Sequence, residues 1–176
     1  MKSTYTIDPV HSSVQFSVRH MMISNVKGAF SSVKGNVVYD ADAPEIGSID
    51  AEIDASTINT LDANRDTHLK SADFLDVAQY PTITFKSTSI KAADDGLKIS
   101  GNLTIHGVTK PAVLQVEEIT PEGKDPWGNT RIGTSAKSKI KRSDFGLTWN
   151  AALESGGFLL GDELKLDFEV QLIKQA

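Results

Sequence analysis

The chain of 176 residues contains no cysteine, and this absence excludes several kinds of site. Without thiols there is no disulfide framework, no cysteine-based zinc site and no cysteine nucleophile. Basic residues are also few: 18 Lys and Arg stand against 23 Asp and Glu, so the formal net charge is −5. This balance disfavours a nucleic-acid-binding surface and electrostatic docking on anionic membranes. We therefore expect no nucleic-acid partner and no stable membrane anchor.

Long apolar runs are missing as well. No segment approaches the roughly 20 apolar residues that a transmembrane helix needs. The first residues, "MKSTYTIDPVHSS", include no apolar stretch of signal-peptide length. As written, the sequence predicts a cytoplasmic protein. A mature exported form with a new initiating methionine would read in the same way, and that form would be periplasmic.

Motifs of the common enzyme classes are also lacking. There is no Gly-x-Ser-x-Gly elbow, no phosphate-binding loop and no His-Glu-x-x-His pair. The four histidines, at positions 11, 20, 68 and 106, do not have the spacing of metal ligands. We therefore expect no catalytic residue, no metal site and no cofactor.

What the sequence does contain is strict alternation of apolar and polar residues. In "SVQFSVRH", residues 13–20, one face carries Val14, Phe16, Val18 and His20, and the other face is polar. The same period of two recurs along residues 49–55, 97–105 and 164–172. It is typical of antiparallel strands with one dry face and one wet face. Eight or nine such strands, with no linker or repeat between them, predict one all-β domain over residues 1–176, either a barrel or a sandwich.

The dry faces include small residues in the middle of strands, among them Ala51, Ala55 and Gly101. Protein interiors are close-packed, so small residues at such positions would leave space unless a neighbour fills it. An eight-stranded barrel lined in this way can hold one small ligand. The alternative is that large residues on facing strands occupy the space. Alternation alone leaves both interpretations open.

One segment, "HLKSADFLDVAQYPTITF" at residues 68–85, departs from the strand pattern. His68, Ala72 and Leu75 fall on one arc at helical spacing, while Phe74 is expected to point elsewhere. Pro81 ends any helix, because it lacks an N–H and clashes with the preceding turn. Such a helix would cover an open end of a barrel or pack on the outside of the sheet.

Four stretches together resemble the YceI-like family of bacterial lipocalin-like proteins. They are "YTIDPVHSSVQFSVRHMMISNVKGAF", "RDTHLKSADFLDVAQYPTITF", "GNLTIHGVTKPAVLQV" and "KSKIKRSDFGLTW", in order between about Tyr5 and Leu172. The resemblance implies an extended eight-stranded antiparallel lipocalin-like barrel with one short helix covering an open end. It also implies an apolar lumen that takes a polyisoprenoid or another long-chain amphiphile, for transport or storage. A homodimer formed by edge pairing is a further expectation for such a barrel.

An isoprenoid tail would need an apolar tunnel, and the dry-face residues are the candidates for lining it. They are Val14, Phe16, Val18, Phe30, Ile53, Phe85, Ile105, Leu147 and Phe168. For each residue taken singly, ordinary core packing is the alternative.

A head group would need hydrogen-bond donors at the mouth of the tunnel. The candidates there are His20, His68, Arg142, Trp149 and Asn150. His20 shares the inward parity of its strand, His68 lies on the inner arc of the helix, and Arg142 ends a strand. A histidine satisfied within the core and an ion pair between Arg142 and Asp144 are the structural alternatives.

Two other functions compete with lipid binding. The protein could be an enzyme that acts on an isoprenoid or a lipid ester, with His20 and His68 as a spatial pair. It could instead be a stress-related interaction domain with a fully packed barrel. The absence of catalytic motifs disfavours the first of these.

Overall fold

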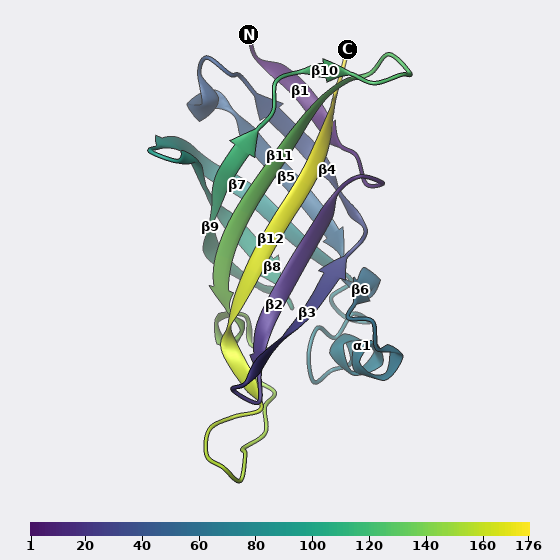
Figure 1. Cartoon of the computed structure of the whole chain (residues 1–176), viewed down its shortest axis with the longest axis vertical. Coiled ribbons are helices and arrows are strands. Elements are labelled where there is room, and N and C mark those ends of the chain that lie inside the picture. The colour runs from purple at the N-terminus through teal and green to yellow at the C-terminus, as the bar shows by residue number, and fades with distance from the viewer.

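Figure 1 shows the computed structural model of the chain, which describes residues 1–176. Most of the chain is strand. The strands are β1 (Ser3–Ile7), β2 (Ser13–His20), β3 (Ser24–Phe30), β4 (Val33–Tyr39), β5 (Ser48–Asp54), β6 (Ile58–Asn59), β7 (Thr82–Ala93), β8 (Gly96–Ile105), β9 (Val108–Ile119), β10 (Gly123–Lys124), β11 (Thr130–Lys141) and β12 (Leu160–Lys174). The helices are α1 (Ala63–Lys70) and three short 3-10 helices, η1 (Pro44–Ile46), η2 (Ala55–Thr57) and η3 (Arg142–Phe145). No helix has the length and apolar character needed to cross a bilayer.

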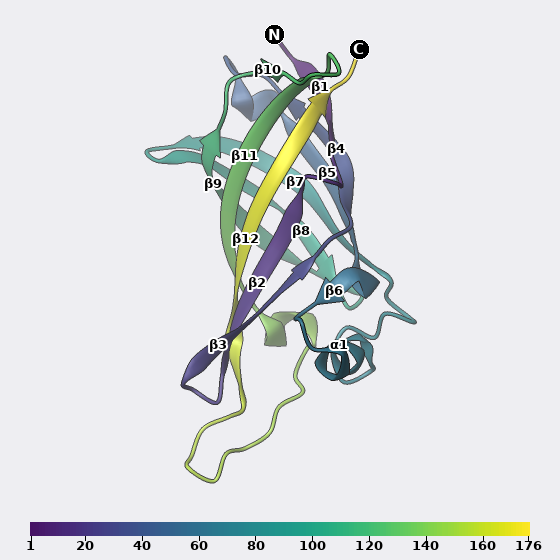
Figure 2. The ribbon, with the colours of Figure 1, turned by 45° about the vertical axis from the view of Figure 1, so that its right-hand side comes forward.

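The strands close into an antiparallel barrel. Round the wall the order is β1, β4, β5, β7, β8, β9, β11 and β12, and β12 then pairs with β1. This arrangement confirms the eight-stranded barrel expected from the resemblance. β2 and β3 lengthen the wall, because β2 pairs with the first part of β12 and β1 with its last part. The barrel is therefore taller than it is wide, with both termini at one end and α1 at the other (Figures 1 and 2).

Irregular pairings bend the long strands into the curved wall. The register shifts between Ser87 and Ser89 in the β7–β8 pair and between Ser135 and Ala136 in the β11–β9 pair. An extra residue on one strand bends it and increases its twist, which a closed barrel requires. Between these irregularities the alternation of the sequence is kept, so apolar side chains point inward along every long strand.

Two apolar clusters occupy the inside of the barrel. The larger one includes Phe85, Ile105 and Phe145 and extends to the end of the barrel near α1. The smaller one, with Tyr5 and Leu172, lies near the termini. Both clusters draw their members from most of the wall, so the interior joins the strands into one unit.

Small residues of the wall do not all leave space. The ring of Phe85 lies against Gly101, where an added Cβ would be only 2.4 Å from the Cζ atom of the ring. Phe16 covers Gly28 in the same manner, also at 2.4 Å. Of the two interpretations, filling by a large residue therefore holds at Gly101, where an inward aromatic ring from the neighbouring strand occupies the space.

The helix differs from the one that the sequence predicted. α1 ends at Lys70, so Ala72 and Leu75 lie beyond it and do not share a helical arc with His68. Ala72 is exposed, whereas Phe74 and Leu75 are both buried. The chain folds back after the helix, with the Leu75 N–H donating to the Leu69 carbonyl oxygen at 3.0 Å. This reversal turns Phe74 inward and brings its ring against that of His68, whereas helical spacing predicted that Phe74 points away from the arc of His68.

A charged network fixes the break between β1 and β2. Arg131 donates through Nη1 to Asp8 Oδ2 at 2.5 Å and through Nε to Asp125 Oδ2 at 2.7 Å. His11 bonds to the same oxygen of Asp8 at 2.9 Å. The Arg131 guanidinium holds the pKa of both carboxyl groups well below the usual range of aspartate. The network thus joins the start of β11 to the β1–β2 break and to the turn after β10.

The Arg131 network predicts how stability depends on pH. Both carboxyl groups have a lower pKa folded than the roughly 3.9 of an unfolded aspartate, so they stabilise the fold fully above about pH 4. That contribution is lost as the pH falls from about 4 toward their folded pKa values. We expect Arg131→Gln to melt below wild type at pH 7 and the gap between their melting temperatures to narrow on acidification. Circular dichroism melts at a series of pH values test this, and a constant gap would contradict it.

The contact between Gly101 and Phe85 predicts that Gly101→Ala is destabilising. The new methyl group would also meet the Lys86 carbonyl oxygen at 2.5 Å, and backbone cannot move as a side chain can. We expect a loss of about 1–3 kcal/mol in the free energy of unfolding, measured by urea denaturation. Gly123→Ala is the matched control, because nothing lies within 4 Å of its added Cβ, and it should change stability by less than about 0.5 kcal/mol.

Candidate functional site

An apolar cavity of about 400 Å³ lies inside the barrel. Of the 47 residues that line it, 40 are hydrophobic, so the cavity offers a water molecule very few hydrogen-bond partners. The lining extends from Tyr39 and Ile49, near the termini, to His68 and Trp149 beside α1. Its volume falls within the range of about 300–1,000 Å³ that is common for ligand pockets. The shape and chemistry suit a long apolar chain.

All nine residues expected to line a tunnel lie along this cavity. They are Val14, Phe16, Val18, Phe30, Ile53, Phe85, Ile105, Leu147 and Phe168. Strand parity explains the eight that lie on strands, since residues two apart share a face of the wall. Phe16 and Phe30 come from the paired strands β2 and β3, and their ring centroids are 5.8 Å apart.

Sequence reasoning missed several residues of the lining. Leu69, Phe74 and Leu75 reach the cavity from α1 and the turn that follows it, and Leu159 and Leu160 reach it from the start of β12. The chain reversal after α1 has no signature in apolar periodicity. The run of three apolar residues at 158–160 was a usable signal, because it directly follows two glycines.

Three rings meet at the end of the cavity near α1. The His68 ring contacts Phe74 and Trp149 edge-on, with centroids at 5.1 and 4.9 Å, and Phe74 and Trp149 are 5.2 Å apart. On its other side, His68 Nε2 lies 2.8 Å from Asp73 Oδ2. The rings join the turn after α1 to the segment after η3. Movement of either segment would therefore alter this end of the cavity.

Arg142 is a buried cation at the same end, with only 6% of its surface exposed. Its Nε donates to the Gly161 carbonyl oxygen at 2.9 Å, and its Nη1 donates to those of Leu147 and Trp149 at 2.9 and 3.2 Å. The alternative of an ion pair with Asp144 is wrong, because Arg142 bonds only to backbone carbonyls.

Arg142 therefore carries a charge that no carboxylate neutralises by direct contact. Burial lowers the pKa of Arg142, and the field of Asp162 opposes this more weakly. Its Nη2 makes no hydrogen bond within the protein, and the residue borders both the cavity and a second, more open groove that Asp162 also lines. An anion at the cavity mouth would supply the missing counter-charge.

The other two mouth candidates differ from one another. His20 is half-buried and lines the cavity, and its ring makes no hydrogen bond, so it is not a histidine satisfied within the core. Asn150 lies outside the cavity lining. Its amide instead donates to the Leu160 carbonyl oxygen at 2.8 Å and accepts from the Leu160 N–H at 3.0 Å. Asn150 thus fixes the start of β12, and it borders the groove beside Arg142 rather than the cavity itself.

Comparison with known proteins agrees with this architecture. The model of the YceI-like domain matches residues 5–172. The chain belongs to the YceI-like family. Protein YceI of Salmonella newport is 41% identical over 138 residues, which cover 78% of this chain and 72% of that protein, and the Salmonella arizonae protein has the same values. The family assignment therefore extends over both the barrel wall and the segment that contains α1.

Solved structures of similar proteins share the fold. The YceI protein of Campylobacter jejuni has a TM-score of 0.74 at 33% identity, covering 90% of both chains. BcnA of Burkholderia cenocepacia has a TM-score of 0.81 at 23% identity, covering 94% of this chain and 98% of that one. A polyisoprenoid-binding domain from Saccharophagus degradans has a TM-score of 0.66 at 16% identity, covering 97% and 98%. At these last two identities the likeness concerns the fold alone.

The bonds of Asn150 predict a structural role that can be measured. In Asn150→Ala the Leu160 N–H and carbonyl lose their side-chain partners. We expect the free energy of unfolding to fall by about 1–3 kcal/mol. Asn102→Ala is the control, since this exposed asparagine makes no side-chain hydrogen bond, and it should shift stability by less than about 0.5 kcal/mol. Equal urea midpoints for the two variants would contradict the role of Asn150.

Proposed function

We propose that the protein binds a long-chain amphiphile, of which a polyisoprenoid is the best-fitting class, inside the barrel for transport or storage. The observation that carries the proposal is the combination of one apolar cavity and one buried arginine at its mouth. The first accepts a hydrocarbon chain, and the second accepts an anionic head group. Membership of the YceI-like family and the likeness in fold to a polyisoprenoid-binding domain support it.

The apolar lining provides enough driving force for a chain ligand. Burial of a CH₂ group is worth about 0.8 kcal/mol, so a chain of about 20 carbons gains about 16 kcal/mol in total. The loss of translational and rotational freedom costs about 4–15 kcal/mol. A longer chain therefore binds with a surplus, whereas a short one does not. This favours ligands with many isoprene units over small apolar molecules.

The end of the cavity near α1 is suited to a phosphate or a carboxylate. Arg65, whose guanidinium bonds to Thr60, lines the cavity at this end together with Arg142, His20 and His68. Charge-assisted hydrogen bonds from a guanidinium to an oxyanion are short and strong. We place the head group here, because the rest of the lining is almost entirely hydrophobic.

Neither competing function has an observation that favours it. An enzyme acting on an isoprenoid or a lipid ester would need a group positioned for acid–base or nucleophilic chemistry. Arg142 is held by carbonyl oxygens and His68 by Asp73 and two rings, which suits binding. The size of the cavity argues against a fully packed interaction domain. We therefore propose a binding protein.

Blocking the cavity should abolish uptake of the lipid. Ala136 is buried and lines the cavity in the middle of β11, so Ala136→Trp would obstruct the path of a chain without adding charge. Phe16→Asp would place a carboxylate in the same apolar lining. We expect both variants to bind a polyprenyl phosphate at least about tenfold more weakly than wild type, as measured by native mass spectrometry.

Gln15→Asp is the matched control for this experiment. Gln15 neighbours Phe16 on β2 but is exposed on the outer face, so its substitution should leave binding unchanged. Thermal melts establish which variants are folded. Binding of wild-type strength by folded Ala136→Trp would contradict a chain within the barrel, whatever happens to Phe16→Asp.

A further inference from the structure

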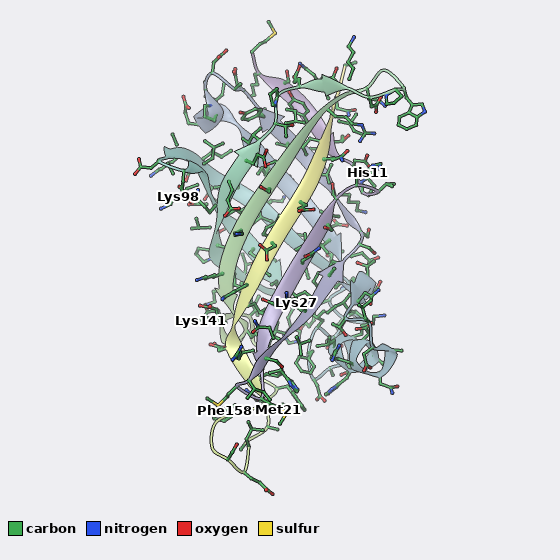
Figure 3. All side chains as sticks on the ribbon, in the orientation of Figure 1. His11, Met21, Lys27, Lys98, Lys141 and Phe158 are labelled. Atoms are coloured by element: carbon green, nitrogen blue, oxygen red, sulfur yellow. The ribbon has the colours of Figure 1, made fainter.

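Two loops project beyond the barrel at the end where α1 lies, and they carry exposed apolar side chains. One is the β2–β3 turn at residues 21–23, and the other is the segment of residues 151–159 before β12 (Figures 1 and 2). Met21, Met22, Ile23 and Phe158 are 44%, 61%, 73% and 61% exposed. We call these four residues the apolar tip. Figure 3 labels Met21 and Phe158 near one another at this end.

The two loops are held together, so the apolar tip is one surface. The Met21 N–H donates to the Leu159 carbonyl oxygen at 2.7 Å. The side chain of Met22 lies against Gly157, where an added Cβ would be 2.2 Å from its sulfur. Contiguous exposed apolar surface of this kind marks a site of interaction with a partner or a membrane.

The backbone of the tip favours an interaction role over a purely structural one. Met21 and Met22 both have positive φ, 52° and 62°, in the left-handed region that side chains rarely adopt. Asn and Gly suit a hairpin turn with two such residues best. Large apolar residues suit neither the turn geometry nor an exposed surface, so their presence here indicates a role in interaction rather than in folding.

The apolar tip is continuous with the cavity. His20 directly precedes Met21 and lines the cavity. Leu159 directly follows Phe158 and also lines it. Both loops that form the tip therefore connect at their bases to the cavity wall. Any partner surface that contacts the tip would therefore lie next to the end of the cavity where we place the head group.

Basic residues cover the outer wall next to the tip. Lys139 on β11 lies directly opposite Lys165 on β12, and the same cross-strand row continues through Ser17 to Lys27 on β3. Like charges opposite one another are destabilising, so this row lowers the stability of the sheet.

The next row toward the tip adds further positive charge. It includes Lys141 on β11 and Arg19 on β2, with Glu163 as its acidic residue. We call Arg19, Lys27, Lys139, Lys141 and Lys165 the basic face. All five are exposed, and Figure 3 labels Lys27 and Lys141 on this side of the barrel. Glu163, Asp162 and Glu154 are exposed at the same end, so the excess of positive charge is confined to the basic face of a chain whose net charge is −5.

We propose that the apolar tip and the basic face dock the protein reversibly on an anionic phospholipid bilayer. The tip inserts among the head groups, the basic face meets the anionic surface, and the mouth of the cavity lies at the membrane. This inference rests on the proposed function, because a water-insoluble chain must pass between a bilayer and the cavity. Reversible peripheral binding needs both an apolar and an electrostatic contribution, and this end of the barrel supplies both.

A bilayer fits these features better than a protein partner. Four side chains form too small an apolar patch for the interface of a stable dimer. The basic face spans four strands of a curved wall, and it matches the diffuse charge of a lipid surface better than a single acidic pocket.

Vesicle flotation tests the docking. Wild-type protein should float with phosphatidylcholine vesicles that contain about a third phosphatidylglycerol, and float less with phosphatidylcholine alone or in high salt. The double variant Met22→Asp/Ile23→Asp and the triple variant Lys27→Glu/Lys139→Glu/Lys165→Glu should each bind anionic vesicles at least about tenfold more weakly.

Two control variants carry substitutions of the same kind elsewhere, a single apolar-to-Asp change and a triple Lys-to-Glu change. Trp127→Asp alters an apolar residue that is 81% exposed in the β10–β11 turn, at the end with the termini. The triple variant Lys91→Glu/Lys98→Glu/Lys110→Glu makes the same change of charge on β7, β8 and β9. Both should float as wild type does. Failure of wild type to float, or equal flotation of the tip variant and Trp127→Asp, would overturn the proposal.

Two further measurements separate docking from the proposed function and from dimer formation. Native mass spectrometry with a polyprenyl phosphate should show unchanged binding in the tip variant, so loss of flotation with retained lipid binding supports docking. If the wild-type protein binds the polyprenyl phosphate but does not float with vesicles, docking is overturned and the proposed function still stands. Sedimentation velocity reports the oligomeric state. A wild-type dimer that the tip substitutions dissociate, with flotation unchanged, would make the tip a dimer surface and refute the proposal.

Discussion

The pairing of β12 with three strands is the constraint on which the structure depends. One edge of this 15-residue strand pairs with β11, and the other edge pairs with β2 and then with β1. Because these pairings close the sheet, every long strand has an inner and an outer face. The alternation of the sequence then sorts the side chains, with apolar residues facing the interior and polar residues facing solvent. The cavity lining, the smaller cluster at the termini and the charged outer wall all follow from that sorting. The residues that fix β12 at its two ends, Asn150 and Arg131, therefore matter for the site although neither lines the cavity.

Arg142 joins this closure to the chemistry of the cavity mouth. Its three hydrogen bonds tie the start of β12 to the segment that follows η3, so the same guanidinium stabilises the wall and presents a charge to the interior. Backbone carbonyls satisfy some of its donors without neutralising it. A buried cation in this state favours an anion more strongly than an ion-paired arginine would, because no carboxylate must first be displaced. Under the proposed function, this one side chain would both position the start of β12 and recognise the head group.

The parts of the fold and site that could be predicted are those that depend on strand parity. Val14, Phe16 and Val18 face the cavity because a period of two leaves no other choice once the barrel closes. The closure into a barrel was predicted only from the family resemblance, since alternation occurs in both barrels and sandwiches. Contacts between distant segments could not be read in this way: Phe85 fills the space at Gly101, Phe74 turns inward after a chain reversal, and Asn150 bonds to Leu160. Each of these depends on where one segment lies relative to another, and periodicity within a segment does not encode that.

The same sorting explains why net charge was a poor guide to the surface. A total of −5 is an average over a wall whose two ends and several faces differ. Parity places Lys137, Lys139 and Lys141 all on the outside of β11, and closure then brings Lys165 directly opposite Lys139. Nothing in local propensity favours that opposition, which weakens the sheet. The repulsion between Lys139 and Lys165 lowers the stability of the sheet, and these residues lie beside the apolar tip and the cavity mouth. This placement is best explained if the surface binds a negatively charged partner. For a protein proposed to exchange its ligand with a membrane, the lipid bilayer is the surface that satisfies both features together.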